Sequence, residues 1–411
     1  MTIAARDMDT QLRHWRTDTK GCGRRNHLNN AVAALMPTPV VEAMHAHLEL
    51  ERHIGAYEAA DACVAQIGQS YEDIAALLGA PAHNVALVAN STAGLEQALS
   101  NIDFECGDTI ITPRCDYISN QMQYRALQRR PAVSIVHADD LPEGGVDAGS
   151  VRELLRQQRA RLVAISWVPT NSGLVQDVEA VGGVCREFDV PYLIDACQAV
   201  GQIPIDVARL ECDYLFFTSP KFLRGPRGMG AMYASDRALS AVPGHGRRTL
   251  DDALRGPDRA GARCFEDCEL PYALVLGQGA AVRYALMVGI NTAQARSWAL
   301  GAQVRSGLEA IPGVRLIERG RQRCAIVTAA VGGWRASEIV HALRERDINT
   351  SAALCEYGML DCDVQGMDSA IRISPHYYNT EREIEELIGA MAELASIPAA
   401  LDKMGPGPAV R

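Results

Sequence analysis

The central part of the chain, from about residue 55 to 240, alternates short apolar segments with stretches of helical periodicity. Several of these segments are apolar throughout, as expected of strands that are buried on both faces of a sheet. Such alternation is typical of a mainly parallel sheet covered by helices. Seven strands are predicted, at residues 85–88, 109–112, 133–136, 162–167, 191–195, 214–217 and 231–234.

The segments around this sheet predict a division of the chain into unequal parts. Thr38 and Pro39 form a start signal for a helix, with Thr38 as the N-cap, so the preceding residues are expected to be an arm. A later helical pattern is broken near Gly289 and would connect two domains. The expected parts are the arm (1–37), a large domain (38–270), the connecting helix (271–300), a small α+β domain that also includes the arm (301–400) and a flexible tail (401–411).

Composition excludes several classes of protein. The formal charge is -10, and no lysine and arginine run offers a basic face to a nucleic acid. The N-terminus has no uninterrupted apolar segment, so neither a signal peptide nor a membrane anchor is expected, and a cytoplasmic location is predicted. The 12 cysteines lack paired C-x-x-C clusters, which favours reduced thiols over disulfides or a metal site. A small-molecule substrate and no metal are therefore expected.

Three polar residues lie where two neighbouring strands end. Asp195 ends one apolar strand, Gln198 follows it by three residues, and Lys221 lies just beyond the next strand. The carboxyl ends of the strands of an open α/β sheet form the ligand crevice, so these side chains are expected to meet there. A lysine that forms an imine and a carboxylate beside a pyridine nitrogen are what pyridoxal 5′-phosphate (PLP) chemistry requires.

At these residues the chain resembles the class V aminotransferase family of fold-type I PLP enzymes, which includes cysteine desulfurases, isopenicillin N epimerase and several C–S lyases. The family's Asp-x-x-Gln strand end, Schiff-base lysine and Gly-Pro-x-Gly-x-Gly are matched by Asp195, Gln198, Lys221 and residues 225–230. The resemblance implies an α/β fold, with a large domain around a mainly parallel seven-stranded sheet and a smaller C-terminal α+β domain. It also implies that Lys221 holds PLP, that Asp195 pairs with the pyridine nitrogen and that Gln198 contacts the phenolic oxygen.

The resemblance assigns further residues to the cofactor. Ser91, Thr92 and Ala93 open a helix after a strand, where N–H groups and hydroxyls can bind the cofactor phosphate; in isolation they would indicate a simple N-cap. Thr218 matches a Ser or Thr position that binds the same phosphate. Tyr117 stands where desulfurases usually have a histidine, so it is predicted to stack on the ring and to alter any acid–base step of that histidine.

The substrate side of the site is also predicted from the resemblance. Arg372 matches the arginine that binds the substrate α-carboxylate, since a guanidinium can form two parallel hydrogen bonds to a carboxylate. Thr170, in the segment V-P-T-N-S-G, is expected near the ring oxygen of PLP. The other predicted substrate residues are Asn29, Asn30, Asn171 and Arg224. For Arg224, scaffolding of the cofactor loop is the alternative.

The cofactor class leaves several reactions open. A desulfurase needs a mobile nucleophilic cysteine, and Cys355 lies in a different sequence context from the family's segment. The segments V-P-T-N-S-G, L-R-G-P-R-G and F-E-D resemble the branch that contains hercynylcysteine sulfoxide lyase and the C–S-cleaving enzymes of lincosamide antibiotic biosynthesis. The predicted reaction is β-elimination from a cysteine S-conjugate. Decarboxylating oxidative deamination, transamination, epimerisation and desulfuration are the alternatives.

The resemblance also predicts the protein's partners. Residues 263–273, RCFEDCELPYA, resemble a stretch that reaches the phosphate bound by the partner subunit. This implies a homodimer with shared active sites. The expected ligand is a small amino acid, with neither a nucleic acid nor a membrane as partner.

Overall fold

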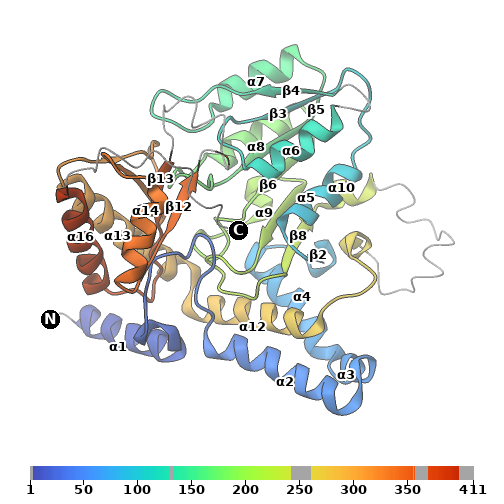
Figure 1. The fold of residues 1–411 in the computed structure, drawn as a ribbon. Coiled ribbons are helices and arrows are strands. Elements are labelled where there is room, and N and C mark those ends of the chain that lie inside the picture. Colours follow the sequence, from blue (N-terminus) through green and yellow to red (C-terminus); the bar gives the residue numbers. More distant parts are fainter. Residues whose placement is uncertain (1–2, 129–132, 242–260, 355, 357–368, 398–411) are drawn as a thin grey trace.

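The computed structural model describes residues 3–128, 133–241, 261–354, 356 and 369–397. Its largest element is a seven-stranded sheet in the order β2-β8-β7-β6-β5-β3-β4 (Figure 1). All seven predicted strands are confirmed. Their bounds are β2 (Val85–Val88), β3 (Thr109–Thr112), β4 (Ser134–His137), β5 (Ala160–Ser166), β6 (Tyr192–Asp195), β7 (Tyr214–Thr218) and β8 (Gly230–Ala234).

The pairing within this sheet brings several strand ends together. Strands β4, β3, β5, β6 and β7, in this order across the sheet, pair in parallel. Strand β8 is antiparallel to both of its neighbours, β7 and β2. Ser166, the last residue of β5, pairs with Asp195, and Asp195 pairs with Phe216 of β7. The carboxyl ends of the central strands therefore form one edge, as the crevice rule requires.

Helices cover both faces of the sheet. Neighbouring strand residues enter different buried clusters: Ile110 and Phe216 belong to one, and Ile111 and Phe217 to the other. This explains why the strands are apolar on both faces. The helices are α2 (Thr38–Ile54), α3 (Ala56–Ala62), α4 (Val64–Leu78), α5 (Ser91–Ser100), α6 (Ile118–Leu127), α7 (Ala148–Gln157), α8 (Val178–Glu187), α9 (Val207–Leu210), α10 (Asp236–Ser240) and α12 (Tyr272–Val288).

The N-terminal arm is more ordered than its sequence indicates. It contains α1 (Ile3–Asp18), a 3-10 helix (Lys20–Gly23) and β1 (Asn26–His27) before α2 begins. The N-cap of α2 is Pro37, not Thr38. The predicted capping role of Thr38 is wrong, because Thr38 is already the first residue of the helix and its hydroxyl donates to the carbonyl oxygen of Asp18 (2.9 Å).

A second, four-stranded antiparallel sheet follows, in the order β12-β13-β10-β9. Its strands are β9 (Val314–Leu316), β10 (Val327–Val331), β12 (Ser351–Leu354) and β13 (Ser369–Ile373), and it is accompanied by α13 (Ile290–Glu309), α14 (Ala336–Glu345) and α16 (Glu381–Ser396). The arm joins this region, because β1 pairs in parallel with β11 (Ile348–Asn349).

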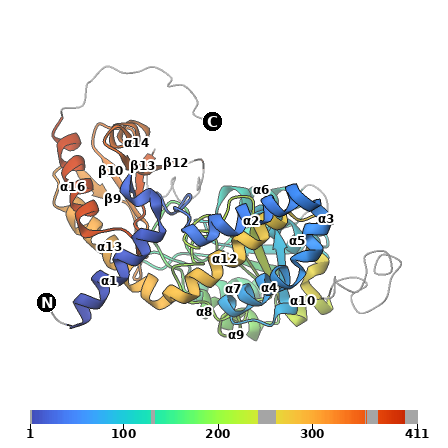
Figure 2. The same cartoon turned by 90° about the horizontal axis from the view of Figure 1, so that it is seen from below.

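The long helical pattern after residue 270 forms two helices. Gly289, with φ +84°, separates α12 from α13, and their axes meet at a bend of 79°. α12 runs beside α2 (Figure 2) and is buried over most of its length. Within the described residues, no single helix has both the length and the apolar character needed to cross a membrane; α12 and α13 reach that threshold only when counted together.

The loop between β7 and β8, which carries Lys221, lies close to the backbone at Gly201. Gly201 has φ +92°, and a Cβ atom there would overlap the backbone of Phe222 and Leu223. Only glycine tolerates both the left-handed conformation and this close approach.

Gly201→Ala should therefore destabilise the protein far more than a positive φ alone does. Gly107→Ala is a matched control, because Gly107 has φ +88° but, apart from its chain neighbours, no atom within 4 Å of the place that a Cβ would occupy. We expect Gly107→Ala to lower the free energy of unfolding by about 1 kcal/mol, and Gly201→Ala by about 3 kcal/mol or more, since the lysine loop must also move. Chemical denaturation measures both. Equal losses would contradict the contact.

Candidate active site

The carboxylate of Asp195 lies at the end of β6 and is almost fully buried, with 7% of the residue exposed. Its Oδ1 accepts a hydrogen bond from the Cys197 N–H (2.9 Å), and its Oδ2 accepts one from Asn120 Nδ2 (2.9 Å). Among the described residues, no lysine, arginine or histidine forms an ion pair with it. A buried carboxylate of this kind is a suitable partner for a cationic ring nitrogen.

Lys221 lies in a loop whose backbone carbonyls accept hydrogen bonds from the arm, from within the loop and from the segment after β13. Ala34 of the arm donates to the Pro220 carbonyl (2.7 Å), the Arg224 N–H donates to the Lys221 carbonyl (2.9 Å), and His376 Nε2 donates to the Phe222 carbonyl (2.9 Å). Lys221 itself is half-buried. No hydrogen bond or ion pair engages its Nζ within the described part of the chain. The loop is thus fixed while the amine stays available.

The charges of Asp195 and Lys221 both affect the pKa of the buried Cys197 thiol. Burial, the largest effect, raises the pKa of its thiol to about 12; the charge of Asp195 adds to this, and that of Lys221 opposes it. Both charges therefore act on one buried side chain. At neutral pH the thiol is protonated and is a poor nucleophile.

The start of α5 provides the predicted phosphate site. Asn90 is the N-cap, and its side chain accepts from the Ala93 N–H (3.0 Å), so this donor already has a partner. Ser91 is half-buried and Thr92 is exposed, in the first turn, where helix N–H groups attract anions. Thr218 ends β7 and donates weakly to the Met229 carbonyl (3.4 Å).

Gln198 and Tyr117 also lie close to the strand ends. Gln198 Nε2 donates to the Ala31 carbonyl (3.0 Å), while its buried Oε1 has no hydrogen-bond partner within the described residues. Tyr117 is half-buried at the N-cap position of α6. Ser219, in the lysine loop, is fully buried with its hydroxyl likewise unpartnered. Unsatisfied buried polar atoms of this kind are expected where a ligand binds.

Asp116 and Asn120 also lie at this site, although the sequence patterns did not predict them. Asp116 is buried and accepts hydrogen bonds from Ser166 and Asn120, among others. Burial raises its pKa to about 6, against the opposing effect of these hydrogen bonds, and the charge of Asp195 raises it further. The signal was present as an Asp and an Asn four residues apart around Tyr117, a spacing that places both on one side of a helix start.

Arg372 on β13 reaches the large-sheet region through Thr170. Its Nη1 donates to the Thr170 carbonyl (2.6 Å) and hydroxyl (3.0 Å), and its Nε donates to Ser351 Oγ (3.1 Å). Asn171 Nδ2 donates to the Leu354 carbonyl (2.9 Å), and its buried Oδ1 has no described partner. The structure therefore brings Arg372, Thr170 and Asn171 together. Asn29 bridges to Ser374 beside them.

Two predicted substrate residues have other roles. Asn30 is fully buried; it donates to the Ser374 carbonyl (2.7 Å) and accepts from the Tyr378 hydroxyl. Arg224 is 2% exposed, and its guanidinium donates to Leu35, Tyr377 and Thr19. Because these polar atoms are already engaged inside the protein, the geometry favours structural roles for Asn30 and Arg224 over the predicted substrate binding. For Arg224 it favours the scaffolding alternative.

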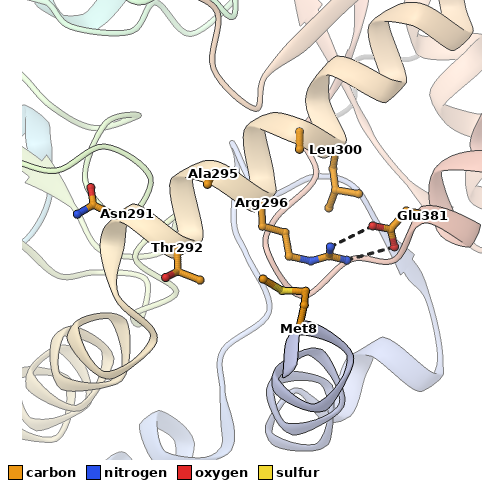
Figure 3. A pocket seen from close by; sticks show the side chains of 8 residues that line it. Met8, Asn291, Thr292, Ala295, Arg296, Leu300 and Glu381 are labelled. Carbon is orange, nitrogen blue, oxygen red and sulfur yellow. Dashed lines mark hydrogen bonds and ion pairs between the residues drawn. The ribbon is translucent and has the colours of Figure 1, made fainter. Parts of the chain in front are cut away.

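A separate hollow of about 490 Å³ lies between α1, α13 and α16. Its wall includes Met8, Thr292 and the ion pair between Arg296 and Glu381 (Figure 3). None of the predicted site residues lines it. Within the described residues, no group of three or more His, Cys, Asp or Glu side chains is arranged to hold a metal ion.

Residues 26–387 match the family described as aminotransferase class V. The chain belongs to this family. A probable cysteine desulfurase from Methanothermobacter thermautotrophicus is 25% identical over 397 residues, which cover 91% of this chain and 96% of that protein. The family assignment thus rests on nearly the whole chain.

Solved structures support the same fold. The apo structure of a cysteine desulfurase from Thermococcus onnurineus NA1 has a TM-score of 0.83 at 21% identity, over 93% of this chain and 98% of that chain. A cystine C–S lyase in complex with its product cysteine persulfide has a TM-score of 0.78 at 22% identity, over 91% and 99%. The chain therefore has the α/β fold of fold-type I PLP enzymes.

Class V aminotransferases use PLP, and this protein is a PLP-dependent enzyme. Its residues suit the cofactor: Asp195 lacks a cation, Lys221 Nζ lacks a partner among the described residues, and Gln198 has an unpartnered buried oxygen. Composition narrows the choice of lysine, because the chain contains only Lys20, Lys221 and Lys403. Lys20 is exposed on the arm, and Lys403 lies outside the described residues.

Replacing Arg372 by lysine should weaken amino-acid binding far more than PLP binding. A point charge replaces a planar guanidinium that can form two parallel hydrogen bonds. We expect the KM for the amino acid to rise by about 10-fold to 100-fold, which corresponds to about 1.4 to 2.8 kcal/mol. Arg315→Lys, on exposed β9 of the same sheet, is the control. Steady-state kinetics and PLP titration give both quantities; equal weakening of both would make Arg372 structural.

Proposed function

We propose that the protein is a PLP-dependent C–S lyase that cleaves a cysteine S-conjugate by Cα deprotonation and β-elimination. The observation that carries the proposal is the state of Cys197. This thiol lies in the fields of both Asp195 and Lys221, yet it is buried and its pKa is raised to about 12. The site thus has an available amine base, whereas its own thiol is unsuited to attack sulfur.

Asp195, Arg372 and Lys221 each have a different role in this proposed reaction. PLP, when bound, supplies a protonated ring that accepts the electron pair left at Cα. Asp195 holds the ring nitrogen in its protonated form, and Arg372 orients the substrate through its α-carboxylate. Lys221 removes the Cα proton. The electron pair left at Cα would then form a Cα=Cβ double bond as the C–S bond breaks with its electrons moving to sulfur, and the remaining three-carbon fragment would hydrolyse to pyruvate and ammonia.

The alternative reactions make different demands on the chain. A desulfurase requires a thiolate that attacks the substrate sulfur, and the cysteine considered for this role, Cys355, lies outside the described residues. An aminotransferase requires a keto-acid acceptor, an epimerase releases no ammonia, and a decarboxylating oxidative deaminase releases an aldehyde. β-Elimination expels the sulfur together with its own substituent, so it needs no enzyme thiol. This matches the protonated state of Cys197.

The proposal includes a homodimer with shared active sites, located in the cytoplasm and acting in secondary metabolism such as antibiotic biosynthesis. The homodimer is supported by the resemblance of residues 263–273 and by the apolar side chains exposed on α2, α3 and α4. Tyr57 is 82% exposed and Val64 68%, and Leu48 is half-exposed nearby on α2. Apolar groups gathered on neighbouring helices are typical of protein–protein interfaces.

Product analysis of Cys355→Ala tests the reaction. With a panel of cysteine S-conjugates, the variant should keep most of its activity and release a thiol or sulfenate with pyruvate and ammonia, because no enzyme thiol takes part. Cys106→Ala, at an exposed position, is the matched control. Mass spectrometry with and without a keto acid identifies the products. Release of alanine together with a persulfide that depends on Cys355 would overturn the lyase proposal.

A further inference from the structure

Behind Asp195 lies a second buried carboxylate, that of Asp116. One nitrogen joins the two groups: Asn120 Nδ2 donates to Asp116 Oδ1 (3.0 Å) and to Asp195 Oδ2 (2.9 Å). An amide NH2 has two hydrogens, so it can serve both carboxylates at once. Asp116, Asn120 and Asp195 are each less than a tenth exposed. The three side chains form a continuous acid–amide–acid array.

The array is held by the ends of three strands. Thr112, the last residue of β3, donates to Asp116 Oδ2 (3.1 Å), and Ser166, the last residue of β5, donates to Oδ1 (2.5 Å). The Tyr117 N–H donates to Oδ1 as well (2.7 Å). Asn120 and the side chain of Tyr124 also hydrogen-bond Asp116, and so many donors favour the ionised carboxylate. Asp195 belongs to β6, the strand next to β5.

No cation within the described residues forms an ion pair with either carboxylate. We propose that Asp116 and Asn120 are positioning residues for the cofactor: Asn120 sets the rotamer of Asp195, and Asp116 holds a second negative charge that keeps the ring nitrogen of PLP protonated. Through Asp195, this charge acts on the ring without touching it. The inference requires PLP and the orientation of Asp195, but it does not depend on which reaction the enzyme catalyses.

The charge of Asp116 also affects the stability of the protein without cofactor. The charged and titratable groups that face Asp116 are Asp195 from β6 and Tyr124 from α6, the helix that follows Asp116. Because the folded-state pKa of Asp116, about 6, lies above its ordinary value of 3.8, the folded state binds this proton more tightly than the unfolded state. The contribution of Asp116 to the stability of the apoprotein should therefore fall as pH rises from about 4 to 6 and stay lowered above that range.

Asp116→Asn removes the charge while preserving the shape. The amide oxygen can still accept from Tyr117, Ser166 and Asn120, and the Thr112 hydroxyl can accept from the new NH2. Reconstitution with 15N-labelled PLP allows the ring nitrogen of the holoenzyme to be titrated by NMR. We expect its titration midpoint to fall by about one pH unit, and PLP binding to weaken about tenfold. At pH 8 the apoprotein variant should unfold at a higher temperature than the wild type.

Asp108→Asn is the matched control. Asp108 is also a buried carboxylate, but it precedes β3 at the amino ends of the parallel strands, away from the site, and it is paired with Arg159. The ring nitrogen and PLP affinity should be unchanged in this variant. If Asp116→Asn likewise leaves the midpoint and the PLP dissociation constant unchanged, the inference is wrong. These readouts do not involve turnover, so a failure here is distinct from a failure of the lyase proposal.

Asn120→Ala distinguishes the positioning effect of Asn120 from the effect of the Asp116 charge. It also tests the inference if Asp116→Asn does not fold. It leaves both carboxylates but removes one of the two donors that orient Asp195. We expect PLP to bind about tenfold more weakly, with no fall in the midpoint of the ring nitrogen, because the negative charges remain. Wild-type PLP affinity in Asn120→Ala would contradict the positioning role.

Discussion

An ionised carboxylate that is buried without a cation is unfavourable, and Asp195 is in this situation at the end of β6. Two donors, the Cys197 N–H and Asn120 Nδ2, satisfy its oxygens without neutralising its charge. In the proposed function, the protonated ring nitrogen of bound PLP would supply the missing positive charge. Asp195 can hold its position because β5, β6 and β7 end at one edge in parallel register, so the sheet, the cofactor and the charge balance depend on one another.

The lysine is positioned by contacts that lie far apart in the sequence. The arm, through Ala34, and the segment after β13, through His376, both bind carbonyls of the loop that carries Lys221. Arg224, three residues beyond the lysine, lies over the rings of Tyr284, Tyr377 and Tyr378. This buried cation is stabilised by aromatic faces, a carbonyl and hydroxyls. The lysine loop, the arm and the segment after β13 therefore pack together and hold the backbone at Lys221 in place.

The sequence predicts the strands well because each is buried on both faces and therefore apolar throughout, as in residues 85–88 and 214–217. It also predicts where Asp195 and Lys221 lie, because Asp195 ends one such strand and Lys221 lies just beyond the next. It fails where a role depends on direction or on distant partners. Asn30 and Arg224 lie close to the cofactor loop in sequence or in space, but tertiary contacts turn their polar atoms into the protein. Whether a side chain faces a ligand or the interior is decided by packing.

Asp116 and Asn120 illustrate the opposite error. Around Tyr117 the sequence directs attention to the aromatic ring, and an aspartate before a helix is usually an N-cap. Its role becomes visible only when β3, β5 and β6 are placed side by side, because β3 and β5 end in its donors Thr112 and Ser166, and β6 ends in Asp195, which shares the Asn120 amide. The Thr38 cap was misassigned for a related reason: the carbonyl of Asp18, 20 residues earlier, is not a local feature of the sequence.

The central claim is that Lys221 is the residue that binds PLP covalently, and the small number of lysines permits a direct test. The holoenzyme would be reduced with borohydride, digested, and mapped by mass spectrometry for the pyridoxyl group. The account predicts the label on the peptide that contains Lys221 and none on Lys20 or Lys403. A label on either of those lysines, with Lys221 unmodified, would contradict it.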